Sequence, residues 1–494
     1  MADSSGLLLL LSLSLSLSLL LSTHSRTLIP KTQLLDISSS LQQASALLSI
    51  SSHPKSSLQQ SLSTQPNWLN STSPSFSISI HPREAVHFSN PKSYRSLVIS
   101  RLERDAARVH SLNTKLQLAL QDIKKSDLMP ETAGDFQLED LTAPLTSGAS
   151  KGSGEYFARL GVGTPPQDMY MVIDTGSDVN WLQCAPCVDC YSQADPIFDP
   201  ATSSSHAPLP CDAPLCTALD NAACSGGRCQ YQVNYGDGSF TVGDFVTETM
   251  SFGSSGAVEK IGIGCGHDNE GLFVGSDGLV GLGGGAVSLP SQIQATSYSY
   301  CLVDRDSLSA STLEFNSGLP ANSITAPLIK NQKLDTFMYL NVVGMSVGGK
   351  SLSLPPSLFR IDESSGRGGI IVDSGTAITR LQTEVYESLR DSFRSLATNL
   401  PPPSGGVLLF DTCYDLSGLT SVQVPTVAFQ LAGGKSLQLP AKNYLIPVDT
   451  AGTYCFAFAG TSAPLSIIGN VQQQSTRVAY DLANKVVGFA PNSC

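Results

Sequence analysis

The chain has 494 residues, of which 41% are apolar and 14% are charged. This apolar fraction is sufficient for a large core and excludes wholesale disorder. With 29 Lys and Arg residues against 41 Asp and Glu residues, the formal net charge is −12. We therefore expect no nucleic-acid partner for the molecule as a whole, because phosphate contacts need a basic face.

Charge and cysteine content divide the chain into a leader and a body. Residues 26–150 carry 12 Lys and Arg against 10 Asp and Glu, a charge of +2, whereas residues 151–494 carry 17 against 30, a charge of −13. All 12 cysteines lie between Cys184 and Cys494. The sequence therefore predicts a weakly basic leader joined to an acidic, cysteine-bearing body.

Residues 1–25 are predicted to be a signal peptide. Gly6 to Leu21 is an unbroken run of Leu, Ser and Gly, which is short for a membrane span but suits the apolar core of a secretory signal. An uncleaved anchor is the alternative, because no Lys or Arg precedes the run. We expect a secretory protein without stable membrane insertion, destined for the apoplast, with the endoplasmic reticulum or vacuole as alternatives.

Residues 26–150 are predicted to be a prosegment. Its first part, 26–92, is rich in Ser, Gln and Pro, which favours loose order, and it contains a glycosylation acceptor at Asn70. Within 94–125, apolar residues recur at three- and four-residue steps, as in an amphipathic helix. The arginines of this helix are expected on its other faces: Arg95, Arg101, Arg104 and Arg108.

Three roles are open for this basic helix. The first is a solvated helix on the protein surface, the second is a helix that contacts a membrane or nucleic acid, and the third is a helix that docks on the acidic body and is later removed. The third interpretation is preferred, because the body carries a formal charge of −13. Maturation is then expected to cut the chain near residues 130–153.

From Gly154 onward the sequence is typical of an all-β protein. Short runs of Val, Ile, Tyr, Phe and Thr alternate with Gly, Pro, Asp and Ser turns. Residues 382–398 form the best candidate for a helix. We expect an N-terminal lobe with a Cys-rich insertion over 151–335 and a C-terminal lobe over 336–494.

One carboxylate motif occurs twice in the body. Residues 171–177 read MVIDTGS and residues 370–376 read IIVDSGT, so that each apolar run ends in Asp-Thr/Ser-Gly-Ser/Thr. A buried strand here delivers a carboxylate to its end, and the glycine permits a tight turn. The flanking hydroxyls are able to donate hydrogen bonds that favour the ionised carboxylate.

A second repeat supports the first. The last residue of the segment 279–281 (LVG) lies 107 residues beyond Asp174. The last residue of the segment 467–469 (IIG) lies 96 residues beyond Asp373. Each is expected to thread behind its own Asp loop, so that the body consists of two related halves. Such a duplication brings Asp174 and Asp373 face to face as a dyad.

The body resembles the pepsin-like aspartic endopeptidases. The resemblance rests on motifs in the family's order, which are GVGTPPQ, DTGSDVNWLQC, YGDGS, GLVGLG, VDSGT and SIIGN. The Cys-rich segment from Cys184 to Cys229 and the segment GCGHDNEGLF are similar to the plant nepenthesin-type branch, and within it to the guard-cell aspartic proteases. This resemblance implies a bilobal double-β-barrel fold with pseudo-twofold symmetry and few short helices.

The resemblance also implies a mechanism and its residues. Asp174 and Asp373 hold a water that attacks the peptide bond of a polypeptide substrate in acid, with no cofactor and no metal. The enzyme is then made as an inactive precursor, inhibited by its own prosegment, and is expected to be a monomer. The remaining site residues carry family roles: the flap residues Tyr235, Gly236 and Asp237, the flap-positioning Trp181, the carboxylate donors Ser177 and Thr376, and the loop braces Thr175 and Ser374.

Cys184, Cys187 and Cys190 are spaced as in some zinc or iron–sulfur sites. Disulfides are the preferred interpretation because the cysteine count is even and a signal peptide is expected. By resemblance, the pairs are Cys413–Cys455, Cys211–Cys229 and Cys216–Cys224.

Other chemistries fit the body less well. Its two histidines, His206 and His267, lie near no G-x-S-x-G motif, and the Gly-rich stretch 281–286 lacks the Lys of a nucleotide loop. The main rival is a binding or inhibitor protein, since some relatives with this fold have lost their catalytic residues. Acid-dependent cleavage of casein distinguishes the two.

Overall fold

The structure is a computed structural model that describes residues 30–49, 74–87, 91–121, 155–235, 239–271 and 273–494. The predicted signal peptide, the acceptor Asn70 and the expected cleavage region 130–153 lie outside the described residues. None of the helices within the described ranges combines the length and the apolar character needed to cross a bilayer.

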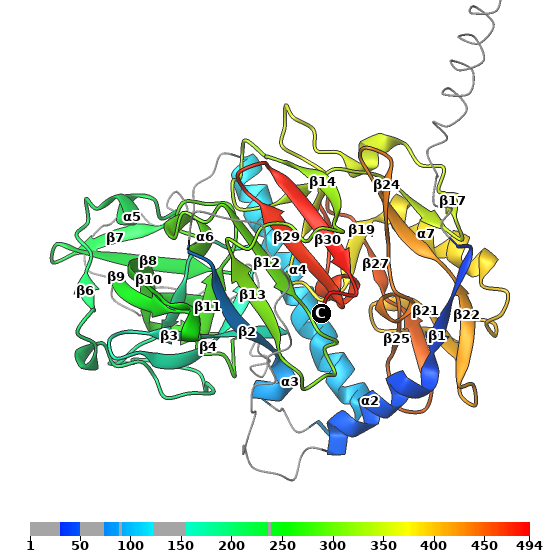
Figure 1. Cartoon of the computed structure of the whole chain (residues 1–494), viewed down its shortest axis with the longest axis horizontal. Coiled ribbons are helices and arrows are strands. Elements are labelled where there is room, and N and C mark those ends of the chain that lie inside the picture. Colours follow the sequence, from blue (N-terminus) through cyan, green and yellow to red (C-terminus); the bar gives the residue numbers. More distant parts are fainter. Residues whose placement is uncertain (1–29, 50–73, 88–90, 122–154, 236–238, 272) are drawn as a thin grey trace, which may run out of the picture.

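Strands dominate the body, as predicted, and form two lobes on either side of a central group of strands (Figure 1). The N-terminal lobe contains β3 (Tyr156–Val162), β4 (Gln167–Asp174), β5 (Trp181–Gln183), β6 (Ala207–Pro208), β7 (Ala222–Ser225), β8 (Arg228–Asn234), β9 (Phe240–Ser251), β10 (Ala257–Glu270) and β11 (Gly278–Gly281). The central group contains β2 (Phe76–Pro82), β12 (Ser297–Cys301), β13 (Ser311–Phe315), β14 (Ile324–Ile329), β29 (Thr476–Asp481) and β30 (Val486–Pro491). These strands and those of the N-terminal lobe belong to one continuous closed sheet.

Part of the C-terminal lobe continues this closed sheet, and the rest forms smaller sheets. Its strands are β15 (Tyr339–Leu340), β16 (Val342–Val347), β17 (Lys350–Ser351), β18 (Ile370–Val372), β19 (Thr379–Gln382), β20 (Gly405–Val407), β21 (Phe410–Asp415), β22 (Ser421–Pro425), β23 (Val427–Leu431), β24 (Lys435–Gln438), β25 (Leu445–Pro447), β26 (Thr453–Phe456), β27 (Phe458–Thr461) and β28 (Ser466–Ile468). Two four-stranded sheets, β17-β16-β23-β24 and β20-β21-β26-β25, form its outer part. The strands β18, β19, β27 and β28 connect this lobe to the site.

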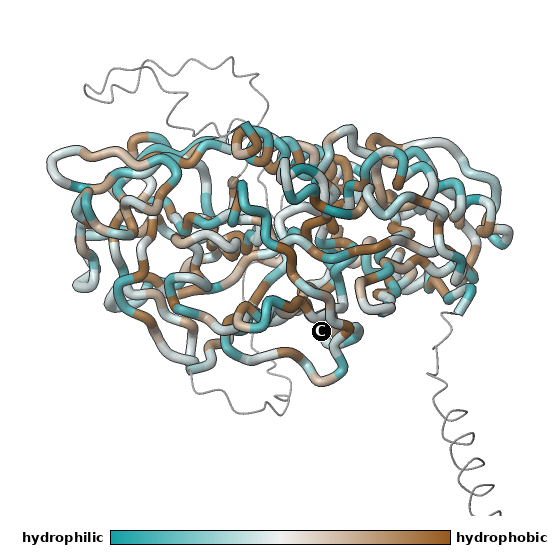
Figure 2. The backbone as a smooth tube through the Cα atoms, turned by 90° about the horizontal axis from the view of Figure 1, so that it is seen from above, coloured by the Kyte–Doolittle hydropathy of each residue, from teal (hydrophilic) through white to brown (hydrophobic). Residues whose placement is uncertain are grey.

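Helices are few and mostly short in the described body. They are α5 (Pro214–Thr217), α6 (Leu289–Gln292), α7 (Thr383–Leu396) and α8 (Asn470–Gln473), with 3-10 turns at η3 (Pro200–Thr202), η4 (Gly253–Ser255), η5 (Pro356–Phe359) and η6 (Ala441–Asn443). The helix α7 confirms the one helix that the body's sequence pattern predicted. Apolar stretches follow the inner strands of both lobes, and polar stretches follow many of the outer loops (Figure 2), as expected for sheets with one buried face.

Loose order over residues 26–92 was a wrong prediction for parts of that segment. It contains β1 (Thr32–Asp36), α2 (Ile37–Ser49), β2 and α3 (Arg83–Val86). The strand β1 pairs with β22 of the C-terminal lobe, and β2 lies between β3 and β13. These segments gain order by pairing with the body, although the alternation of Phe76, Ile78 and Ile80 with polar residues was a visible strand signal.

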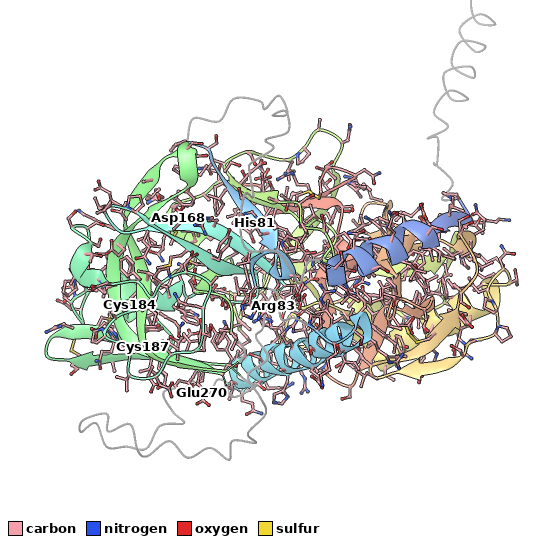
Figure 3. The ribbon with its side chains drawn as sticks, turned by 90° about the horizontal axis from the view of Figure 1, so that it is seen from below. His81, Arg83, Asp168, Cys184, Cys187 and Glu270 are labelled. Carbon is pink, nitrogen blue, oxygen red and sulfur yellow. A yellow bond between two sulfur atoms is a disulfide. The ribbon has the colours of Figure 1, made fainter. Side chains whose placement is uncertain are left out.

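The predicted leader helix is present as α4 (Tyr94–Leu120). Ser93 caps its start, because its side chain accepts a hydrogen bond from the backbone N–H of Ser96 at 3.1 Å. The helix extends from the N-terminal lobe to the C-terminal lobe, and α2 lies beside it on the latter (Figure 3). Its apolar side packs into the body at both ends, with Leu97 in one buried cluster and Leu112 in another.

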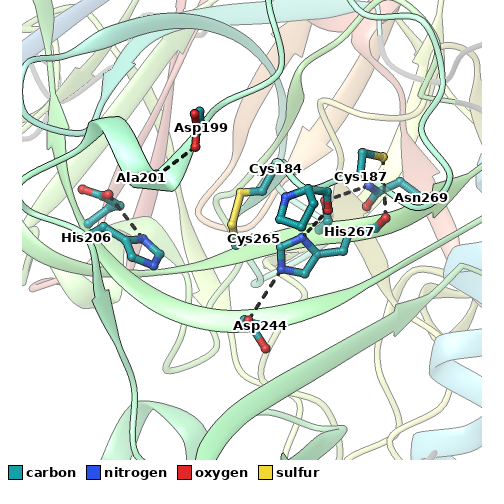
Figure 4. Close-up of a disulfide and its surroundings, with 12 residues drawn as sticks. Cys184, Cys187, Asp199, Ala201, His206, Asp244, Cys265, His267 and Asn269 are labelled. Atoms are coloured by element: carbon teal, nitrogen blue, oxygen red, sulfur yellow. Dashed lines mark hydrogen bonds and ion pairs between the residues drawn. A yellow bond between two sulfur atoms is a disulfide. The ribbon is translucent and has the colours of Figure 1, made fainter.

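All 12 cysteines form disulfides, which confirms the disulfide interpretation of the Cys-rich segment. Figure 4 shows the bond between Cys184 and Cys265. The pairs are Cys184–Cys265, Cys187–Cys190, Cys211–Cys224, Cys216–Cys229, Cys301–Cys494 and Cys413–Cys455. The prediction of Cys413–Cys455 is confirmed, and these residues lie opposite each other on β21 and β26.

The two pairings predicted within the hairpin region, Cys211–Cys229 and Cys216–Cys224, are wrong. Cys224 and Cys229 lie opposite each other across the β7–β8 hairpin. Which of the two bonds to Cys211 and which to Cys216 therefore depends on the surroundings of each cysteine. Helix α5 buries Cys216 in the same apolar cluster as Cys229. Cys211 and Cys224 both lie nearer the surface, and they pair with each other.

Candidate active site

Each dyad aspartate stands at the end of a buried strand. Asp174 ends β4, which pairs in parallel with β11, and Asp373 directly follows β18, which pairs in parallel with β28. This confirms that residues 279–281 and 467–469 lie behind their own Asp loops. Only glycine fits at the last residue of each of these two segments. A Cβ at Gly281 would lie 2.3 Å from the carbonyl carbon of Asp178, and a Cβ at Gly469 would lie 2.5 Å from the carbonyl oxygen of Ala377.

A matched set of donors holds the two carboxylates. Ser177 Oγ donates to Asp174 Oδ2 at 2.7 Å, and Thr376 Oγ1 donates to Asp373 Oδ2 at 2.6 Å. The backbone N–H of Gly176 adds a donor to Asp174 Oδ1 at 2.9 Å. The positions predicted for Ser177 and Thr376 are therefore within direct hydrogen-bonding distance of the aspartates, and their hydroxyls fix the carboxylate planes.

The two Asp loops brace each other through Thr175 and Ser374. The backbone N–H of Ser374 donates to Thr175 Oγ1 at 2.9 Å, and the backbone N–H of Thr175 donates to Ser374 Oγ at 3.2 Å. Each hydroxyl also donates to a carbonyl oxygen just before the opposite aspartate, Val372 and Ile173. The loops therefore form one unit with near-twofold symmetry.

Arg108 of the leader helix lies between the two carboxylates. Its Nη2 donates to Asp174 Oδ1 and lies 3.3 Å from Asp373 Oδ1, and its Nε lies 3.4 Å from Asp373 Oδ2. Both aspartates are buried, with 1% and 0% of their surface exposed. A single cation thus contacts both acids, which requires that the acids face one common space.

The electrostatic surroundings move the two pKa values apart. Burial raises the pKa of Asp174, and the charge of Asp373 adds to this effect against the opposing attraction of Arg108. For Asp373 burial also acts to raise the pKa, but Arg108 and the hydrogen bond from Thr376 outweigh it, so the net pKa is lowered. Aspartic proteases are the standard example of two carboxyls that titrate as such a pair.

Tyr235, predicted as a flap residue, and Trp181, predicted as its support, lie in contact. Trp181 Nε1 donates to the hydroxyl of Tyr235 at 3.0 Å, and both rings contact Phe273 edge-on at 4.9 Å between centroids. The predicted flap residues Gly236 and Asp237 lie outside the described residues. A cavity of about 310 Å³ extends from Arg108 and Ser177 to Tyr235 and Val287.

A buried ionic cluster attaches the leader helix to the body. Arg104 pairs with Glu155 at 2.7 Å, and Arg101 pairs with Asp306 at 2.6 Å. The hydroxyl of Tyr94 donates to the same Asp306 at 2.5 Å. Arg101 is only 1% exposed, so the arginines that the helical pattern assigned to outer faces, Arg101, Arg104 and Arg108, point into the body.

A reversed ion pair, in which the leader supplies the acid, lies about one helical turn from Arg108, and no sequence pattern predicted it. Asp105 of the leader accepts from Arg380 Nη2 at 2.6 Å. Its other oxygen accepts the backbone N–H groups of Ala377 and Ile378 at 2.6 and 3.2 Å. The leader helix therefore presents both a cation and an anion to the same loop region.

Comparison with known families covers both lobes. A family described as "Xylanase inhibitor N-terminal" matches residues 156–316, and one described as "Xylanase inhibitor C-terminal" matches residues 338–491. Among solved structures, the chain is similar to one titled "Crystal structure of edgp", with a TM-score of 0.55 and 21% identity over 70% of this chain and 92% of that one. Basic 7S globulin from soybean gives a TM-score of 0.53 with 18% identity, over 68% of this chain and 92% of its own. At these identities the structural likeness concerns the fold alone.

Relatives in sequence are plant proteases. "Aspartyl protease family protein 2" of Arabidopsis thaliana is 51% identical over 414 residues, which is 82% of this chain and 83% of that protein. "Protein ASPARTIC PROTEASE IN GUARD CELL 2" of the same plant is 45% identical over 80% of this chain and 83% of its own length. "Aspartic proteinase nepenthesin-1" of Nepenthes gracilis is 43% identical over 77% and 87%. The chain therefore belongs to the pepsin-like aspartic endopeptidases, in the plant branch that includes nepenthesin.

Proposed function

We propose that the protein hydrolyses peptide bonds with a water molecule held between Asp174 and Asp373. The observation that carries this proposal is the contact of one guanidinium nitrogen of Arg108 with oxygens of both carboxylates. Once the leader has departed, the space of that nitrogen is open to a water within reach of both acids. The shared cation thus marks the position of the reacting oxygen.

The chemistry needs one proton shared by the pair. The ionised carboxyl accepts a proton from the water as the water oxygen bonds to the peptide carbonyl carbon, and the protonated carboxyl donates to the carbonyl oxygen. The C–N bond then breaks as the carboxyl that took the proton of the water donates it to the departing nitrogen. One hydroxyl of the tetrahedral intermediate returns its proton to the other carboxylate, which restores the singly protonated pair. The burial of Asp174 and Asp373 on one common space supports a singly protonated pair, because two buried carboxylates that face each other repel.

We propose that the full-length chain is an inactive precursor. Arg108 fills the position of the water, and the cluster of Arg101, Arg104 and Tyr94 holds the helix in place. Arg101 and Arg104 are buried, so their release requires that their carboxylate partners lose charge or that the leader be cut. The maturation cut proposed near residues 130–153 would separate this helix from the body.

Acid is the proposed trigger for leader release. Burial acts to raise the pKa of Glu155, but the attraction of Arg104 and Arg101 outweighs burial and lowers the net pKa below its ordinary value of 4.5. A lowered pKa means that the docked leader is favoured while Glu155 is ionised. That contribution is fully present above about pH 4.5 and is lost as the pH falls through the lowered pKa. Asp306, whose pKa is lowered by Arg101 against burial, acts in the same direction.

The substrate path is proposed to run between the dyad and the Tyr235 flap. The cavity of about 310 Å³ is lined by Gly176 and Ser177 of the first Asp loop and by Tyr235, and a closing hairpin excludes water from the reaction. Polypeptides in extended form are the substrate class, because an open groove between two lobes accepts a strand rather than a compact ligand. No cofactor is needed for this chemistry.

A secretory destination is also proposed, with the apoplast preferred over the vacuole or endoplasmic reticulum. The support is the predicted signal peptide together with six disulfides among the described residues, since such bonds persist in oxidising compartments. Fusion of residues 1–25 to a reporter and localisation of that reporter in plant cells tests this proposal. Retention of the reporter in the cytosol would contradict it.

The central experiment is cleavage of casein by the full chain at steps from pH 7 to pH 3, with and without pepstatin. We expect no cleavage at pH 7 and pepstatin-sensitive cleavage below about pH 4.5, the ordinary pKa of Glu155. Full activity of the intact precursor at neutral pH would contradict the inhibitory leader. No cleavage at any acidic pH after removal of the leader would contradict the proposed hydrolysis and would favour a binding or inhibitor protein.

A further inference from the structure

An acidic side chain of the leader helix, Asp105, is bound by hydrogen-bond donors of the body. Asp105 is 3% exposed, and its carboxylate accepts three hydrogen bonds from one short segment of the C-terminal lobe. Arg380 Nη2 donates at 2.6 Å, Ala377 N at 2.6 Å and Ile378 N at 3.2 Å. Two backbone N–H groups and one guanidinium that converge on a carboxylate are typical of a site for that group.

These donors lie next to the reacting centre. Ala377 directly follows Thr376, the residue whose hydroxyl binds Asp373. Asp105 and Arg108 are three residues apart on α4, which is a rise of about 4.5 Å along the helix. An extended peptide advances about 3.3 Å per residue. The donors are therefore about one or two substrate residues away from the bond that the dyad would cut.

Departure of the leader leaves these donors without their acid. Among the described residues, Asp105 is the one acid that forms an ion pair with Arg380, and Arg380 is 4% exposed. Its second nitrogen, Nη1, donates to the carbonyl oxygen of Ile378 at 2.8 Å, which holds the guanidinium against the same loop. A substrate carboxylate that takes the place of Asp105 would restore this charge-assisted pair.

We propose that Arg380, with the N–H groups of Ala377 and Ile378, forms a carboxylate-binding subsite that selects a Glu or Asp side chain within two residues of the scissile bond. Asp105 occupies this subsite in the precursor as an internal substitute for the substrate acid. This inference rests on the proposed peptidase function. It makes Arg380 a residue that determines specificity and not a member of the dyad.

The test uses the protein after acid activation and separation of the cut leader, so that the leader does not dock again at the assay pH. It begins with a peptide whose cleavage site has been mapped by mass spectrometry in a casein digest. A single Glu is placed in turn at each of three positions on either side of the scissile bond, with a matched Gln peptide for each. Assays run at about pH 5, where the Glu side chain is largely ionised because its ordinary pKa is about 4.3. The measured quantity is the ratio of kcat/KM for the Glu peptide to that for the Gln peptide.

We expect a ratio of at least about tenfold at one position within two residues of the bond, equivalent to about 1.4 kcal/mol. Arg380→Met is expected to reduce this ratio to about one while the Gln peptide is still cleaved. Arg380→Lys is expected to retain part of the preference, because it keeps the charge but not the planar fork. Arg394→Met is the matched control, because Arg394 is exposed on α7, and its ratio should equal that of the wild type.

Three results would overturn the inference. The first is a wild-type ratio near one at every position, which is measured without any variant. The second is an unchanged ratio in Arg380→Met; if this variant does not fold, the wild-type scan and Arg380→Lys decide. In both cases cleavage of the Gln peptides leaves the peptidase function intact. The third is no cleavage of any peptide, which contradicts the peptidase function and this inference together.

Discussion

The two lobes present nearly the same loop after each dyad aspartate, but they differ at the fourth position, Asp178 against Ala377, and at the seventh. Ser177 and Thr376 both lie at the third position and bind their own carboxylate. At the sixth position, Asn180 Oδ1 and Thr379 Oγ1 accept the backbone N–H of Gly281 and of Gly469, at 3.1 and 3.0 Å. At the seventh position, the N-terminal lobe has Trp181 and the C-terminal lobe has Arg380.

Residues that the chemistry requires are alike in the two loops, whereas residues that select or admit a substrate differ. The positions that agree either hold a carboxylate or fix the strand behind it. The positions that differ point to partners outside the loop, since Trp181 donates to Tyr235 and Arg380 binds the acid of the leader. The near-twofold symmetry is therefore strict around the two carboxylates and is lost where the cleft begins.

The strongest test of the symmetry is loss of either acid. Asp174→Asn and Asp373→Asn are each expected to lower kcat for casein by about 10³- to 10⁴-fold, because general acid–base catalysis contributes on this scale. The amide keeps the size of the carboxylate, so after removal of the leader, whose Arg108 pairs with both acids, the thermal unfolding of each variant should stay close to that of the wild type. Turnover near the wild-type rate in either variant would show that the two loops are not equivalent partners.

Arg108 contacts both loops at once, so its substitution tests whether this side chain blocks the space that the two carboxylates share. At about pH 5, above the acid release of the leader, the unprocessed Arg108→Met chain is expected to cleave casein about 100-fold faster than the unprocessed wild type. Loss of one partner from a buried ion pair costs about 3 kcal/mol or more, which corresponds to this factor. Initial rates before any leader cleavage appears on a gel provide the measurement.

Arg95→Met is the matched control for Arg108→Met. Arg95 lies on the same helix, but its side chain is 49% exposed and 3.6 Å from Asp449, a geometry that contributes little. This control should behave as the wild type. Equal rates for Arg108→Met and the wild type at pH 5 would contradict the view that this guanidinium blocks the dyad.

The carboxylate loops could be predicted from the sequence, because repetition after an apolar strand gives a local signal. The same holds for residues 279–281 and 467–469, whose parallel pairing the repeat anticipated. The role of Thr175 and Ser374 came from the family resemblance, and the brace is formed as the family implies. These features are encoded within single short segments.

What the sequence did not reveal depends on contacts between distant segments. Asp105 and Arg380 are 275 residues apart, and each in isolation is an ordinary charge on a helix or strand. Docking of the basic helix on the acidic body was predicted from charge and is confirmed by the ion pairs of Arg101 and Arg104, but the sequence did not show which carboxylates these arginines would contact. The exchange of partners between Cys211 and Cys216 has the same cause, since burial by α5 decides it.

Substitution of the loop braces, Thr175 and Ser374, tests the symmetry through the free energy of unfolding. Thr175→Val and Ser374→Ala each leave a buried backbone N–H of the opposite loop without its hydroxyl acceptor. Each is expected to lower the free energy of unfolding by about 1–3 kcal/mol, with similar losses for the two. Denaturant unfolding measures this, and Thr202→Val on an exposed turn is the control. A large loss for one variant and none for the other would mean that a single loop carries the brace.

The smallest expected effect concerns the seventh position of the N-terminal lobe. Trp181→Phe keeps an aromatic ring against Phe273 but removes the Nε1–H that donates to Tyr235 at 3.0 Å. One hydrogen bond of this kind is worth about 1 kcal/mol, so kcat/KM for a peptide should fall about fivefold. Because Trp181 contacts the flap and not the leader acid, the ratio between Glu and Gln peptides should remain that of the wild type. A change in that ratio would show that the two diverging positions act on one another across the cleft, and the separation between flap support and charge recognition would then be wrong.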